Sequence, residues 1–72
     1  MKYTFVLEPT ATGFSAYVPD LPGCIATGAT REETGRRLQE AVEFHLDGMR
    51  EDGTPLPAPS TQAGQIEVAL AA

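Results

Sequence analysis

Hydrophobic and polar residues alternate in two short runs within the first 18 positions of the chain. In Lys2–Glu8, every second residue is aromatic or leucine, and Phe14–Val18 alternates again, with Phe14, Ala16 and Val18 on one side. Such alternation, rich in aromatic and β-branched residues, predicts β-strands. The turn-forming cluster Pro9–Gly13 would join these strands as a hairpin. The corner Pro19–Gly23 precedes a third short strand, Cys24–Gly28, so we expect a three-stranded meander.

The spacing of apolar residues changes from two to three or four after Thr30, which predicts a helix over residues Arg31–Glu51. Thr30 and Glu33 form a capping box, in which each side chain accepts the other residue's backbone amide. Gly53 fits the position after the helix end, and Pro55 prevents continuation. The apolar stripe expected to face the sheet comprises Leu38, Ala41, Val42, His45, Leu46 and Met49.

The remainder of the chain is a proline-rich connector, residues 53–64, followed by an alternating run, Gln65–Leu70. Alternating prolines favour an extended connector, and the final run predicts a fourth strand. The predicted fold is therefore α+β with the order β-β-β-α-β in a single domain, 1–72. A right-handed crossover gives a four-stranded mixed sheet of order 3-2-1-4 with the helix on one face. Its two edge strands are natural places for pairing between chains.

Composition narrows the function. A chain of 72 residues with 42% hydrophobic residues can fold but has a thin core, so self-association into a homodimer or homotetramer is expected. Five Lys and Arg against ten Asp and Glu give a net charge of −5, which disfavours direct binding to DNA or RNA. Apolar runs are too short for a membrane span, and no targeting signature is visible, so we expect a cytoplasmic location.

Residues suited to catalysis or metal binding are scattered. His45 is the only histidine and falls at the margin of the helix stripe, while Cys24 is the only cysteine and is better explained as a core residue than as a nucleophile. The acids Glu8, Asp20 and Glu67 do not occupy strand centres, as a two-metal nuclease would require. We therefore expect no enzyme activity, no cofactor, no metal and no small-molecule ligand.

Four motifs, in order along the chain, resemble the HicB family of antitoxins. They are Gly13–Cys24, Ala26–Glu33, Glu40–Leu46 and the Asp-Gly-Thr-Pro-Leu-Pro-Ala-Pro exit at residues 52–59. This resemblance implies a partly degraded ribonuclease H-like fold without its catalytic acids. It also implies a bacterial protein that neutralises a HicA-type mRNA interferase, a small basic toxin, by masking its surface. Many members carry an additional C-terminal DNA-binding module, for which we expect no room before Ala72.

The corner after the second predicted strand is the candidate contact with such a partner. We assign partner binding there to Asp20, Leu21, Pro22 and Cys24, although this turn can also serve only to orient the third strand. Two further hypotheses stay open. One is an orphan interaction domain that mainly contacts itself, and the other is a residual metal-dependent nuclease.

Overall fold

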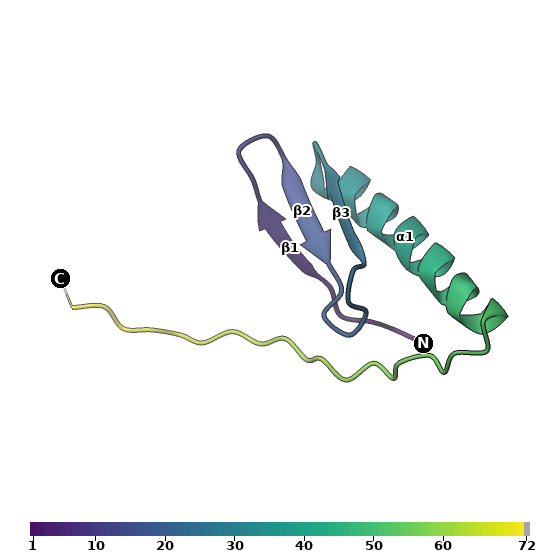
Figure 1. Ribbon diagram of the computed structural model, residues 1–72. Coiled ribbons are helices and arrows are strands. Elements are labelled where there is room, and N and C mark those ends of the chain that lie inside the picture. Colours follow the sequence, from purple (N-terminus) through teal and green to yellow (C-terminus); the bar gives the residue numbers. More distant parts are fainter. Residues whose placement is uncertain (72) are drawn as a thin grey trace.

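Three antiparallel strands and one helix make up the computed structural model, which describes residues 1–71 (Figure 1). The strands are β1 (Val6–Pro9), β2 (Phe14–Tyr17) and β3 (Ile25–Gly28), arranged in the order β1-β2-β3. Both strand pairs are antiparallel. The meander predicted from the alternating runs is therefore confirmed.

The register of the sheet separates a covered face from an open one. Leu7 lies opposite Ala16, which is fully buried and lies opposite Ala26 of β3. In the next row, Tyr17 lies between Val6 and Ile25 and is 40% exposed. Since successive side chains of a strand point to opposite faces, the first row faces the core and the second faces away from it.

The helix α1 (Arg31–Glu51) begins and ends where the local signals predicted. The Thr30 hydroxyl accepts a hydrogen bond from the Glu33 amide at 3.1 Å, which satisfies one free donor of the first turn. At the other end, Gly53 has a φ of 71°, and its amide donates to the Arg50 carbonyl at 3.1 Å. This left-handed residue ends the helix because it turns the backbone out of the helical path.

The core between sheet and helix is small. The hydrophobic side chains buried in it are those of Ala16, Val18, Leu21, Cys24 and Leu38. Thr34 is also fully buried, where its hydroxyl donates to the Thr30 carbonyl at 2.7 Å. A side chain at Gly28 would come within 2.6 Å of that hydroxyl oxygen, so glycine there permits the close approach of β3 to α1.

The predicted fourth strand is the main difference between expectation and structure. Gln65–Leu70 belongs to no strand of the described chain, and the segment extends past β1 away from the rest of the domain (Figure 1). It is extended but lacks a neighbouring strand with which to exchange backbone hydrogen bonds. The sheet of residues 1–71 therefore has three strands instead of four. The single domain 1–72 stays a prediction, and its last residue lies outside the described part of the chain.

Candidate protein-binding site

The corner between β2 and β3 is a rigid loop closed by its own backbone. The Leu21 amide donates to the Val18 carbonyl and the Cys24 amide to the Leu21 carbonyl, each at 3.1 Å. Gly23 has a φ of 88°, a conformation that side chains disfavour. Leu21 points inward and is fully buried, whereas Pro22 is exposed. The corner therefore combines a buried anchor with an exposed tip.

Asp20 fastens the connector that follows α1 to this corner. Its carboxylate accepts hydrogen bonds from the backbone amides of Ser60 and Thr61, at 2.9 and 3.0 Å. The hydroxyl groups of the same two residues also donate to it, at 3.0 and 2.8 Å. The Thr61 amide, followed by the Ser60 amide and the two hydroxyls, lowers the pKa of Asp20 from 3.8 to about 2, since these donors favour the charged carboxylate.

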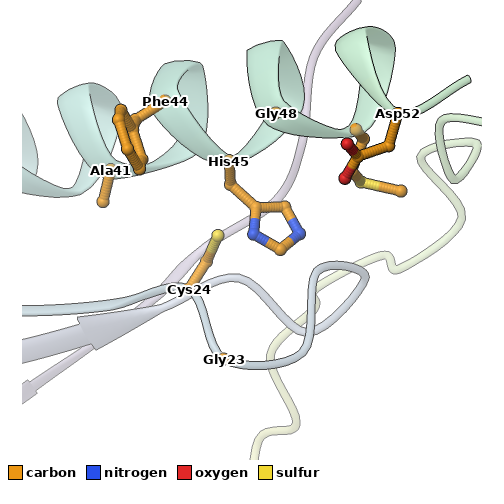
Figure 2. Close-up of a pocket in the computed structure, with 8 residues that line it drawn as sticks. Gly23, Cys24, Ala41, Phe44, His45, Gly48 and Asp52 are labelled. Atoms are coloured by element: carbon orange, nitrogen blue, oxygen red, sulfur yellow. The ribbon is translucent and has the colours of Figure 1, made fainter. Parts of the chain in front are cut away.

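A shallow groove separates the corner from the C-terminal half of α1, with a volume of about 440 Å³. Figure 2 shows His45 pointing from the helix into the space beside Cys24, with Asp52 at one end of the groove. Burial raises the pKa of the Cys24 thiol, because an apolar surrounding disfavours the thiolate. A neutral, buried thiol is a poor nucleophile. The groove is therefore better suited to binding an apolar group than to catalysing a reaction.

The groove exists because helix and strands differ in length. The 21 residues of α1 span about 31 Å at 1.5 Å per residue. A strand of four residues spans only about 13 Å. One part of the helix therefore packs on the sheet, and the other part extends beyond it and faces the corner.

Phe44 is a feature that the sequence analysis missed. This aromatic side chain is 83% exposed and lies on the rim of the groove. Glu40, Asp47 and Glu51 lie three to seven residues from it along α1 and are all exposed, so they share its face. Arg37 lies on this face as well, where it pairs with Glu33 at 2.9 Å. An exposed aromatic side chain on the rim of a groove supplies apolar area that a protein contact can bury. The signal in the sequence was an aromatic residue outside the predicted apolar stripe.

The four residues predicted to bind a partner occupy different environments. Leu21 and Cys24 lie in the core, and the Asp20 carboxylate accepts hydrogen bonds from the connector. Pro22 is exposed. They are brought together by the corner, but only Pro22 presents most of its surface to solvent. Their role in partner binding stays a prediction.

Within residues 1–71, no group of three or more His, Cys, Asp or Glu side chains could hold a metal ion. In the same residues, no helix combines the length and the apolar character needed to cross a membrane.

Comparison with known families identifies the class of protein that this fold and surface define. Residues 3–69 match the family described as HicB_like antitoxin of bacterial toxin-antitoxin system. The chain belongs to this family, as the four ordered motifs indicated.

Individual relatives agree with that assignment. The chain is 36% identical over 62 residues to Antitoxin HicB 2 of Photorhabdus laumondii, covering 86% of this chain and 45% of that protein. It is 40% identical over 57 residues to an uncharacterized 14.9 kDa protein of Haemophilus phage HP1, covering 79% of this chain and 43% of the other. A UPF0150 protein of Helicobacter pylori is 34% identical and matches along its whole length. The chain thus spans under half of the first two relatives and all of the third.

Solved structures show the same fold. The chain is similar to a structure described as Antitoxin HicB3, with a TM-score of 0.70, 32% identity and coverage of 83% of this chain and 44% of that one. It is also similar to a chain in a HicA3 and HicB3 toxin-antitoxin complex, with a TM-score of 0.65 and 33% identity. That match covers 81% of this chain and 66% of the other. These similarities support the three-stranded sheet with one helix.

Proposed function

We propose that this chain is a protein-binding antitoxin module that neutralises a basic, HicA-like toxin by covering part of its surface. The observation that carries the proposal is the HicB family match over residues 3–69, together with the similarity to a chain in a HicA3–HicB3 complex. The activity is binding without catalysis, needs no cofactor and involves no DNA contact by this chain. A cytoplasmic location, a ribonuclease H-like arrangement and self-association are parts of the same proposal.

The contact surface that fits this function comprises the acidic face of α1 around Phe44 and the tip of the corner at Pro22. Phe44 supplies apolar area that becomes buried on binding, and the flanking Glu40, Asp47 and Glu51 attract a basic partner. The net charge of the whole chain, −5, would attract a basic partner in the same way. Asp20, Leu21 and Cys24 contribute to binding mainly by shaping the corner that presents Pro22.

Titration calorimetry with a HicA-like protein encoded beside this gene tests the proposal. We expect binding that weakens as salt rises, because complementary charges are screened. Phe44→Ala should weaken it by on the order of tenfold to a hundredfold, as for a buried aromatic anchor. Gln39→Ala is the matched control, since Gln39 is exposed on another side of α1. No binding to the neighbouring toxin, or equal effects of both substitutions, would contradict the proposed surface.

A second candidate function is an interaction domain that binds chiefly to copies of itself. The row formed by Val6, Tyr17 and Ile25 on the uncovered face of the sheet favours it, because Ile25 is 60% exposed. Coexpression separates the two functions. An antitoxin restores growth to cells that produce the toxin, whereas a self-associating domain leaves the toxin active.

A further inference from the structure

The C-terminal arm, residues 65–71, carries a strand pattern without a strand partner. Ile66, Val68 and Leu70 alternate along it and are 90%, 67% and 87% exposed. Glu67 is the only charged residue of the arm. Three aliphatic side chains on one side of an extended, nearly uncharged segment favour burial in a sheet over exposure to water.

The arm is badly placed to complete the sheet of its own chain. The last hydrogen bond between the connector and the N-terminal segment joins the Thr4 hydroxyl to the Thr61 carbonyl at 2.9 Å, an offset of 57 residues. If the chain continued beside β1 at that offset, Val6–Pro9 would lie opposite residues 63–66. Val68 and Leu70 would then lie beyond the end of β1, next to the hairpin turn, where no strand edge is available.

The arm of a second copy is not held in that alignment, so it can shift along β1 until all three of its aliphatic residues lie beside the strand. We propose that two copies exchange their arms, so that Ile66–Leu70 of each copy adds to the free edge of β1 in the other, along Phe5–Pro9. Such strand addition gives hydrogen-bond partners to the unpaired backbone N–H and C=O groups of both β1 and the arm. Reciprocal exchange closes into a twofold dimer. The proposal rests on the self-association proposed above and not on toxin binding.

A groove between the segment that leads into β1 and helix α1 offers a place for a side chain of the arm. It has a volume of about 500 Å³ and is lined by apolar residues that include Phe5, Leu38, Val42 and Leu46. Phe5, which directly precedes β1, is 49% exposed although the alternation of the segment places it on the same side as Leu7. A strand added along Phe5–Pro9 would reach this groove at Phe5 and bring an aliphatic side chain over it.

The exposed area of the chain agrees with an exchanged arm. A compact protein of 7.7 kDa exposes roughly 4,300 Å², whereas this chain exposes 5729 Å². The surplus of roughly 1,400 Å² is more than the area of about 800 Å² that each partner contributes to a standard interface. Its radius of gyration, 14.9 Å, also exceeds the value of about 11 Å expected for a compact chain of this length. The separate chain is therefore more extended than a compact chain of its length, as an exchanged arm requires.

Sedimentation equilibrium on the full chain, from about 1 to 100 μM, tests the proposal together with one pair of variants. We expect a reversible dimer whose dissociation constant rises on the order of a hundredfold in Val68→Asp, because each dimer would bury two uncompensated charges. Ala69→Asp is the matched control, since it adds the same charge on the other side of the arm. It should change the constant by less than about threefold. Both substitutions lie on exposed residues, so circular dichroism should show an unchanged fold.

Amide hydrogen exchange supplies the second measurement. Exchange of arms predicts protection of residues 65–70 that increases with protein concentration. Protection independent of concentration would mean that the arm pairs with its own sheet, and would overturn the proposal. A dimer unaffected by Val68→Asp would place self-association on another surface, whereas a strict monomer would contradict self-association itself. Neither result bears on toxin binding, which calorimetry measures separately.

Discussion

Replacing Leu21 by alanine tests whether the corner is anchored by its buried side chain. Leu21 is fully buried and is one of five buried hydrophobic residues in the described chain. Truncating such a leucine typically costs about 2–5 kcal/mol, and the amount depends on how far the surroundings collapse into the cavity. Because Leu21 projects into the core from a loop, which can shift more readily than a strand, partial collapse is expected and we predict a loss of about 3 kcal/mol. A chain of 72 residues has a free energy of unfolding of about 4–11 kcal/mol, so this loss is large.

Urea unfolding followed by circular dichroism, at one fixed protein concentration, measures this loss. With a slope of about 1 kcal/mol per molar, the midpoint should fall by about 3 M. Pro22→Ala is the neighbouring control at an exposed position and should change stability by less than about 1 kcal/mol. If Leu21→Ala is unfolded without urea, the volume-conserving Leu21→Met should retain the fold at a cost below about 1.5 kcal/mol. A loss below about 1 kcal/mol for Leu21→Ala would refute the anchoring role.

Three other predictions concern the cap, the connector and a close backbone contact. Thr30→Ala should destabilise the fold by about 1 kcal/mol in urea unfolding, through loss of the helix cap, and Thr30→Ser should restore most of it. The pKa of Asp20 is depressed in the folded chain, so its hydrogen bonds to Ser60 and Thr61 should stabilise the connector above pH 3.8 and be lost as the pH falls toward 2. NMR titration of the Asp20 carboxyl group, with amide exchange measured at Ser60 and Thr61, checks this expectation. An Asp20 pKa near 3.8 would contradict it. Gly13→Ala should destabilise the hairpin by about 1–3 kcal/mol in thermal unfolding, because the new Cβ would lie 2.2 Å from the Gly28 carbonyl oxygen. An unchanged melting temperature would contradict that close contact.

Local signals predicted the helix well and the strands less well. The bounds of α1 follow from a capping box at Thr30 and a left-handed glycine at position 53, both of which act over a few residues. The predicted first strand began at Lys2, but β1 begins at Val6, because its pairing with β2 starts at Tyr17, just before the corner. Strand bounds depend on the neighbouring strand, which alternation in one segment does not specify.

Long-range contacts explain the other differences. Alternation in Gln65–Leu70 predicted a fourth strand but contains no information about which strand edge such a segment would join, and the described sheet has only three strands. The role of Asp20 depends on Ser60 and Thr61, about 40 residues away in the chain, so the sequence placed it in a corner without revealing its partners. Phe44 was overlooked because the helix pattern showed which side is buried, and not where an exposed aromatic would adjoin a groove.

The small core has a consequence for the amount of folded protein present in a cell. A partner that binds only the folded chain stabilises it by about 2.7 kcal/mol when its concentration is a hundred times the dissociation constant. That gain is comparable with the loss expected from removing the Leu21 side chain, one of the five that form the core. The folded fraction should therefore depend on the supply of binding partners, and a thermal melt repeated with increasing partner should shift steadily upward.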